Sequence, residues 1–204
     1  MDDVVRDLGA LEVIYGPFPE GGRLKETAVI TPLQRRWIEA SPFLLLATAG
    51  PDGLDCSPRG DPAPLVRVVD ERTLQLPDRR GNKRVDSLRN IVRDGRVGLL
   101  FLVPGLTTTL RVNGTAVLRT DPALLASLAI GTAVPASVIE VSVQAVYTQC
   151  PKALIRSNLW SPEAFRRAED LPTVGAILAE ITQGSFDGEA YDRAYPQRLA
   201  DTIY

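Results

Sequence analysis

A short segment in the middle of the chain, Arg79 to Arg84 (RRGNKR), carries four positive charges in six positions and leads into a stretch with helical spacing of apolar residues. A helix N-terminus carries roughly half a positive charge, so Lys83 and Arg84 in a first turn would oppose the helix dipole. A bound phosphate reverses that cost, because free N–H groups and basic side chains attract it together. Gly81 allows close backbone approach, and Asn82 can cap or donate. The segment predicts a phosphate site, and a solvated basic loop is the alternative.

Two other groups of residues have a spacing that could serve a ligand. Arg111 and Asn113 project from one face of an alternating strand, where the alternative is an ordinary polar face with cross-strand salt bridges. Lys152, Arg156 and Trp160 lie at i, i+4 and i+8, so a helix there would present a cationic and aromatic stripe. Such a stripe binds planar anions or partner surfaces, or else covers the edge of a core.

The residue types that are absent exclude several kinds of chemistry. The chain has no histidine, which excludes Ser-His-Asp and Cys-His hydrolases and histidine-ligated haem. Cys56 and Cys150 lie far apart, so we predict neither a metal site nor a C-x-x-C pair and expect both thiols to be buried. A bound cofactor is therefore the expected carrier of any difficult chemistry.

Charge and hydropathy restrict the partners and the location. A net charge of -2 argues against general binding of nucleic acid, which usually requires a basic excess. The first seven residues are acidic and lack the pattern of a secretory signal. The longest apolar stretch, residues 97–103, is far shorter than the roughly 20 residues that span a bilayer. We therefore expect a cytoplasmic protein with no membrane partner.

Patterns of apolar and turn-forming residues predict the elements that position these groups. Thr31-Pro32 begins a helix that ends before Ser41, and a second helix follows the basic segment and stops at Gly95. A hairpin is expected from a strand over 43–49, a turn over 50–53 and a partner strand through Cys56. Further strands are predicted over 65–69, 73–76, 96–103 (covered on both faces), 110–119 and 138–147, with short helices beyond residue 161. Many short strands without a regular βαβ rhythm favour a closed antiparallel barrel with helical additions.

Six motifs, taken in chain order, resemble one family. They are Ser41–Thr48 (SPFLLLAT), Ser57–Pro62 (SPRGDP), Pro77–Arg84 (PDRRGNKR), Arg96–Phe101 (RVGLLF), Leu110–Gly114 (LRVNG) and Lys152–Trp160 (KALIRSNLW). Their order and spacing over about residues 33 to 162 are similar to the flavin-nucleotide-binding branch of the family of pyridoxamine 5′-phosphate oxidase.

The resemblance implies a fold and an assembly. It implies a mainly β, α+β fold built on a six-stranded antiparallel split β-barrel of the FMN-binding type. The barrel core would lie at about residues 41–150 of a single domain over 1–204, with helical extensions at both ends. It also implies a homodimer with one FMN in each of two clefts between the subunits.

The same resemblance implies which residues contact the cofactor. The phosphate is expected on basic and polar residues of a strand and of the loop before a helix, namely Arg59, Asn82, Lys83, Arg84 and Ser87. Arg111 and Asn113 would lie near the isoalloxazine, where an arginine stabilises the negative charge that reduction places on the ring. Arg156 and Trp160 are candidates for a second wall of the cleft. No catalytic side chain is identified.

The implied activity is that of an FMN-dependent oxidoreductase, with hydride or electron transfer to or from a small molecule. The oxidase's substrate-binding arginine–histidine motif is absent, so pyridoxamine phosphate itself is not the expected substrate. Two alternatives use the same site: a flavin-binding protein for storage or redox sensing, and a deazaflavin-dependent reductase in which Arg79 and Arg80 bind the anionic tail.

Overall fold

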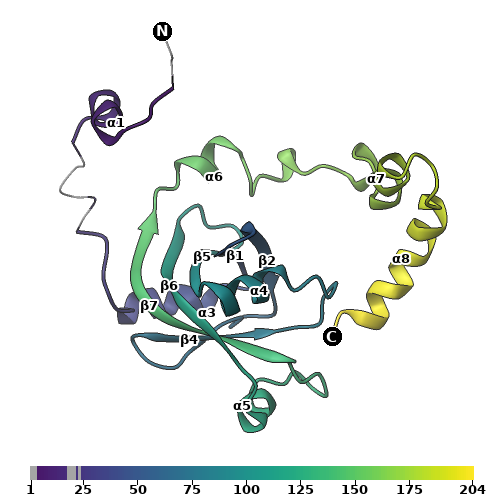
Figure 1. Ribbon diagram of the computed structural model, residues 1–204, viewed down its shortest axis with the longest axis horizontal. Helices are drawn as coiled ribbons and strands as arrows, with labels where there is room; N and C mark the ends of the chain where they lie inside the picture. The colour runs from purple at the N-terminus through teal and green to yellow at the C-terminus, as the bar shows by residue number, and fades with distance from the viewer. Residues whose placement is uncertain (1–3, 18–21, 23) are drawn as a thin grey trace.

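The computed structural model describes residues 4–17, 22 and 24–204, so residues 1–3 of the acidic N-terminal segment lie outside it. Within this range, seven strands form one antiparallel sheet in the order β2-β1-β5-β6-β7-β4-β3 (Figure 1). The strands are β1 (Phe43–Gly50), β2 (Gly53–Gly60), β3 (Arg67–Val68), β4 (Thr73–Asp78), β5 (Arg96–Leu102), β6 (Thr109–Arg119) and β7 (Ser137–Gln149). The helices are α1 (Leu8–Tyr15), α3 (Pro32–Ala40), α4 (Asp86–Arg93), α5 (Pro122–Ser127), α6 (Lys152–Arg156), α7 (Val174–Ile181) and α8 (Gly188–Thr202), with 3-10 turns at Pro162–Ala164 and Ala168–Asp170.

The α+β class is confirmed, but the expectation of a closed, six-stranded barrel is wrong. The sheet has seven strands, and its outermost strands, β2 and β3, do not pair with each other. Strand β3 folds back on β4 through a tight turn in which the Val69 N–H donates to the Thr73 carbonyl at 3.0 Å. Between β2 and β3 the chain passes through Pro62 and Pro64, which lack the N–H groups that would continue a ladder. The sheet is therefore open on this side.

Most of the predicted elements are confirmed with small changes at their ends. Helix α3 begins with a capping box in which Thr31 and Gln34 exchange hydrogen bonds between side chain and backbone. The hairpin of β1 and β2 turns at Gly50 and Gly53, which lie opposite each other. The strand predicted over 65–69 is reduced to the two residues of β3. Helices α1 and α5 were not predicted, although Asp121 caps α5 just before Pro122, a recognisable start signal.

The core lies on the concave face of the sheet. Leu44, Leu46, Leu99 and Phe101 are buried there and pack with Ile38 of α3 and Ile91 of α4. Strand β5 alternates between buried and partly exposed residues, so the prediction that it is covered on both faces is wrong. The opposite, convex face, called the outer face below, is only half-buried.

One close backbone approach fixes the course of β6. The pairing of β6 with β7 shifts register between Asn113 and Gly114. A Cβ on Gly114 would lie 2.1 Å from the carbonyl oxygen of Ser142. Only glycine fits where the two backbones approach this closely.

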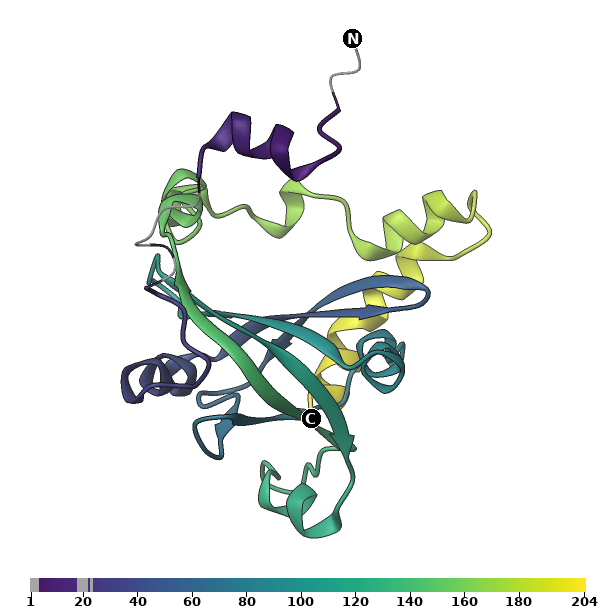
Figure 2. The ribbon, with the colours of Figure 1, turned by 60° about the vertical axis from the view of Figure 1, so that its left-hand side comes forward.

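The helical extensions lie apart from the sheet. Figures 1 and 2 both show α1 and the segment from α6 to α7 on the same side of the sheet, and α8 returns toward it. The Tyr204 hydroxyl donates to Asp61 Oδ1 at 3.1 Å.

Cys56 and Cys150 are exposed, so the expectation that they are buried is wrong. None of the helices in the described ranges is long and apolar enough to cross a membrane.

Candidate functional site

A pocket of about 460 Å³ lies between the ends of β2 and β4. Strand β2 is an edge of the sheet, and the end of β4 pairs with β7 on one side but extends beyond its pairing with β3 on the other. The segment Arg79 to Arg84, called the basic loop below, runs along it. Apolar residues and charged residues line the pocket together: Pro58, Arg59, Gly60, Leu65, Pro77, Asp78, Arg79, Arg80, Gly81, Asn82, Lys83, Val85, Leu88, Val134 and Ala136. The fold thus brings the basic loop to a cavity instead of leaving it on a convex surface.

The cations of the pocket differ in how they are paired. Arg79 Nε donates to Asp61 Oδ2 at 2.6 Å, and its Nη1 donates to the Leu128 carbonyl at 2.8 Å. Asp61 is almost fully buried, with 4% of its side chain exposed, so this pair is neutral and fixed. Arg80 and Lys83 are exposed and have no hydrogen bond or ion pair with any residue in the described part of the chain. These two side chains are available to an anion.

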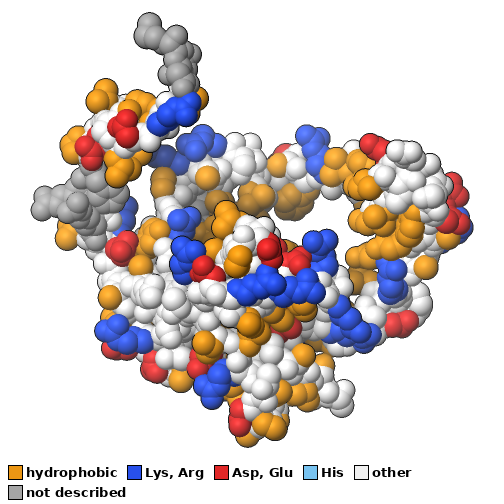
Figure 3. All heavy atoms as spheres, viewed as in Figure 1, with side chains coloured by type: hydrophobic (Ala, Val, Ile, Leu, Met, Phe, Trp, Pro, Cys, Tyr) orange, Lys and Arg blue, Asp and Glu red, His pale blue; other side chains and the backbone are white. Residues whose placement is uncertain are grey.

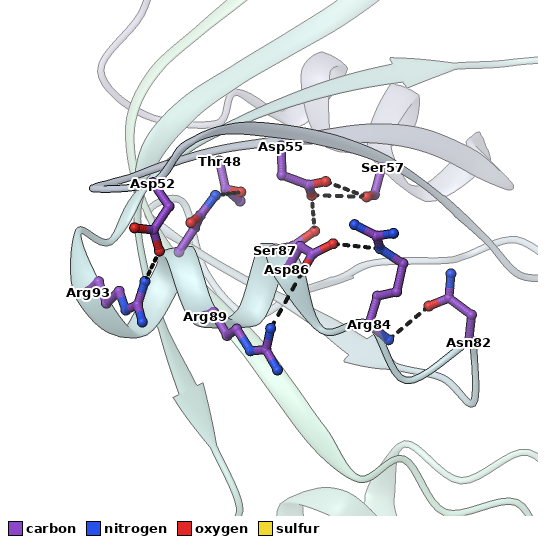
Figure 4. A network of polar contacts seen from close by, with 11 residues as sticks. Thr48, Asp52, Asp55, Ser57, Asn82, Arg84, Asp86, Ser87, Arg89 and Arg93 are labelled. Carbon is purple, nitrogen blue, oxygen red and sulfur yellow. Dashed lines mark hydrogen bonds and ion pairs between the residues drawn. The ribbon is translucent and has the colours of Figure 1, made fainter. Parts of the chain in front are cut away.

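Arg84 is directed away from the pocket. Its side chain is 75% exposed, and its Nε donates to Asp86 Oδ2 at 2.8 Å. Figure 4 shows this pair, together with the hydrogen bond from the Arg84 N–H to Asn82 Oδ1, 3.0 Å long. Asn82 lines the pocket, but Arg84 does not. The sequence alone cannot distinguish Arg84 from its neighbour Lys83.

Arg59 and Ser87 meet beside the pocket and are held by a carboxylate that the sequence analysis did not identify. Arg59 Nη2 donates to Ser87 Oγ at 3.1 Å, and Ser87 Oγ donates to Asp55 Oδ2 at 2.5 Å. Ser57 also donates to Asp55, at 2.9 Å, and Figure 4 shows Asp55 between the two serines. Ser87 is 2% exposed and is absent from the pocket lining. Its only hydroxyl hydrogen is used by Asp55, so Ser87 orients Arg59 instead of facing the pocket.

The start of helix α4 differs from the prediction. The helix begins at Asp86, so Lys83 and Arg84 precede the first turn instead of occupying it. The negative charge of Asp86 in the first turn interacts favourably with the helix dipole. Lys83 and Val85 have left-handed backbones, with φ of 60° and 55°, and no side chain caps the helix. The N–H groups of the first turn have no acceptor within the helix, so they are open to an anion.

Asp78 is the carboxylate of the pocket. It is the last residue of β4 and is half-buried. Burial raises the pKa of Asp78 above its usual 3.8, and the positive charge of Arg59 partly opposes this effect.

Arg111 and Asn113 lie on the outer face of β6, as their alternation predicts. Arg111 Nη1 donates to Tyr147 Oη at 3.3 Å, and the guanidinium carbon lies 5.7 Å from the centre of the Tyr147 ring. Tyr147 is the cross-strand partner of Arg111, and the sequence analysis did not connect the two. The cross-strand contact that was the alternative for Arg111 thus occurs with a tyrosine and is not a salt bridge.

A flat row of small residues crosses the outer face beside Arg111. Ala47, Gly98, Asn113 and Ala145 lie opposite one another on β1, β5, β6 and β7. Strand β2, which carries the pocket residues Pro58 to Gly60, is three strand spacings from β6, or about 14 Å. The row and the pocket are therefore within reach of one extended ligand.

Arg156 and Trp160 do not form the expected helical stripe. Helix α6 ends at Arg156, and Asn158 has a left-handed backbone with φ of 50°. Trp160 Nε1 donates to the Leu106 carbonyl at 2.8 Å, which anchors this segment on the turn between β5 and β6. Neither residue lines the pocket.

The donors around the pocket suit a phosphate monoester. Arg59, Arg80 and Lys83 supply positive charge, and the first turn of α4 supplies N–H groups. The row formed by Ala47, Gly98, Asn113 and Ala145 suits a planar ring, because its side chains are short. The residues present thus fit the two ends of a flavin mononucleotide.

Known proteins give an independent comparison. The family model described as pyridoxamine 5′-phosphate oxidase matches residues 30–150, more than half of the 204 residues. Among solved structures, HupZ from group A Streptococcus is 21% identical over 58% of this chain and 93% of its own, with a TM-score of 0.48. An FMN-binding protein from Syntrophomonas wolfei is 9% identical over 58% of this chain and 89% of its own, with a TM-score of 0.43. No curated protein sequence matches the chain.

The matched segment contains all seven strands, the basic loop and the outer-face residues Arg111 and Asn113. Only α1, the start of the chain and the region beyond residue 150 lie outside it. On the extent of this match, the chain belongs to the pyridoxamine 5′-phosphate oxidase family.

Proposed function

We propose that this protein binds FMN and uses it for hydride or electron transfer with a small molecule. One observation carries the proposal: in the pocket of about 460 Å³, Arg80 and Lys83 have no partner among the described residues and lie beside the uncapped start of α4. Unpaired cations beside free helix N–H groups are the arrangement that binds phosphate monoesters. Membership of the family supports a flavin phosphate as the ligand, because the basic loop lies inside the matched segment.

The residues of the outer face would hold the ring system. Gly98 and Asn113 would contact the flat ring, and Arg111, oriented by Tyr147, would place a positive charge beside it. A fixed positive charge favours the reduced, negatively charged state of a flavin. When bound, FMN supplies the hydride and electron chemistry that the side chains lack.

We also propose that two copies associate through the outer face. Leu45 and Leu100 lie opposite each other there and are only half-buried. A second subunit would cover them and would close the cleft around the ring, with its own Arg156 and Trp160 as the second wall.

The first test is cofactor binding by the purified protein. We expect flavin absorption, and equilibrium dialysis should give about one FMN per chain. A deazaflavin would be recognised by its different absorption spectrum. Aerobic turnover with a reduced nicotinamide distinguishes an oxidoreductase from a protein that only stores or senses flavin. Absence of FMN binding at high micromolar concentration would refute the proposal.

The second test assigns the phosphate to particular cations. Replacing Lys83 by Ala removes a charge-assisted contact of about 1.5–3 kcal/mol, so FMN affinity should fall roughly 10- to 100-fold. Riboflavin, which lacks the phosphate, should bind almost unchanged. Arg84→Ala should reduce FMN affinity less than Lys83→Ala does, because Arg84 pairs with Asp86 outside the pocket. Arg89→Ala is the matched control, since Arg89 is an exposed arginine of α4 that does not line the pocket. Equal losses for FMN and riboflavin in Lys83→Ala would contradict a phosphate contact.

A further inference from the structure

The pocket contains a carboxylate that a simple anion site would not need. Asp78 lines the pocket at the end of β4 and is half-buried, and its carboxylate makes no hydrogen bond or ion pair with any residue that the structure describes. The neighbouring carboxylates differ, because Asp61 is bound by Arg79 and Asp86 by Arg84. Asp78 is thus the acceptor that the fold leaves without a donor in this cavity.

The position of Asp78 is unfavourable for the protein alone and for a bare anion. Burying a carboxyl group without a partner costs free energy, which agrees with the raised pKa of Asp78. A carboxylate also repels an anion bound at Arg80, two residues along the chain and in the same cavity. A ligand that brings its own donors offsets these costs, because an ionised carboxyl group accepts several hydrogen bonds.

Hydroxyl groups next to a phosphate are the donors that this arrangement fits. We infer that Asp78 is a specificity-determining residue that accepts hydrogen bonds from the hydroxyl groups of a phosphorylated polyol. The inference rests on the proposed function, in which the polyol is the ribityl chain of FMN. Arg80 and Lys83 bind the phosphate, and Asp78 selects the hydroxylated chain attached to it.

The test measures three ligands by isothermal titration calorimetry on the full chain: FMN, riboflavin and inorganic phosphate. Asp78→Ala should weaken the binding of FMN and of riboflavin by a similar factor, roughly tenfold or more, because both ligands carry the ribityl hydroxyl groups. The same substitution should strengthen binding of inorganic phosphate, since a like charge is removed. Asp78→Asn keeps an oxygen acceptor in a side chain of the same shape, so this variant should lose less affinity for riboflavin than Asp78→Ala does.

Controls separate a local effect from a general one. Asp86→Asn removes a carboxylate near the same loop but outside the pocket, and it should not weaken riboflavin binding. Circular dichroism of both Asp78 variants checks that they fold, and the isosteric Asp78→Asn gives a reading if Asp78→Ala does not.

The outcomes distinguish this inference from the proposed function. If Asp78→Ala strengthens the binding of both FMN and phosphate, or leaves the affinities for FMN and riboflavin unchanged, Asp78 does not recognise hydroxyl groups and the inference is wrong. If the unmodified protein binds no FMN, the proposed function is wrong, and ribose 5-phosphate becomes the probe. Weaker binding of ribose 5-phosphate by Asp78→Ala would then support the inference, and unchanged binding would overturn it.

Discussion

At the scale of single residues, the pairing of each charge decides what the pocket can bind. Arg79 and Arg84 are neutralised by carboxylates of their own chain, whereas Arg80 and Lys83 are not paired within the described residues. Unpaired cations keep their full attraction for a ligand, because no internal contact has to be broken first. The number of basic residues in the loop is therefore a poor guide to its affinity for anions.

Asp78 makes a prediction about stability and pH. Its folded-state pKa lies above the usual 3.8 because of burial, so ionisation destabilises the folded protein relative to the unfolded chain. That destabilisation is absent below about pH 3.8, develops as the pH rises through the raised pKa, and is complete above it. Without ligand, Asp78→Asn should therefore be more stable than the unmodified protein at pH 7 and equally stable at low pH. Urea unfolding of both proteins at several pH values from about 3.5 to about 8 measures the difference.

Asp86→Asn is the matched control for this prediction. Asp86 lies in the first turn of α4 and pairs with Arg84, so its replacement should lower stability at neutral pH instead of raising it. Equal stability of Asp78→Asn and the unmodified protein at pH 7 would show that Asp78 has a partner in solution.

At the scale of elements, β6 and α4 position the two halves of the site. Strand β6 carries Arg111 and Asn113 on the outer face, and the register shift at Gly114 sets where they lie relative to β7. Helix α4 presents its first turn to the pocket through a loop in which Lys83 and Val85 have positive φ. A β-branched residue such as Val85 rarely adopts this conformation, so the surrounding structure must impose it.

The close packing of β6 on β7 makes a prediction for Gly114→Ala. The added Cβ would lie 2.1 Å from the Ser142 carbonyl oxygen, a backbone atom that cannot move without disturbing the ladder. We expect a loss of roughly 1–3 kcal/mol or more, measured as a lower thermal unfolding midpoint. In Gly60→Ala, the new Cβ would be 3.6 Å from its nearest neighbour, so this control should unfold close to the unmodified protein. Equal unfolding midpoints for the two variants would contradict the close approach of the β6 and β7 backbones at Gly114.

At the scale of the whole molecule, apolar residues left partly exposed on the outer face and on the helical extensions favour association with another chain. In the space-filling view, an opening lies between the sheet and α7, and apolar side chains line the extension beside that opening (Figure 3). Ile177, Ile181 and Leu199 of these two helices are more than 40% exposed. Exposed apolar surface on several elements is typical of a subunit interface.

Light scattering tests the proposed dimer. The unmodified protein should have about twice the chain mass of 22.1 kDa. Leu100→Lys places a charge on the outer face beside Leu45, so it should give a monomer and weaken FMN binding. Val92→Lys is the control, because Val92 is a well-exposed apolar residue of α4 away from that face. A monomer mass for the unmodified protein with FMN still bound would rule out a cleft shared between subunits.

The sequence by itself determined the features that depend on neighbours along the chain. The capping box at Thr31, the turn at Gly50 to Gly53 and the alternation over β6 and β7 arise from residues a few positions apart, and the structure has each of them. The order of the motifs also indicated the family correctly, because it depends only on sequence.

Only the tertiary structure decided which charges face the pocket and whether the sheet closes. Asp61 lies 18 positions from Arg79, and Asp55 lies 32 positions from Ser87, so no local spacing reveals either contact. The first contact neutralises Arg79, and the second holds the buried hydroxyl of Ser87. Lys83 has no such partner among the described residues, so its charge can attract a ligand. The open edge between β2 and β3 likewise depends on how distant strands meet. A local sequence pattern specifies a helix or strand and which of its side chains share a face. Which part of the chain packs against that face depends on residues far away in the sequence.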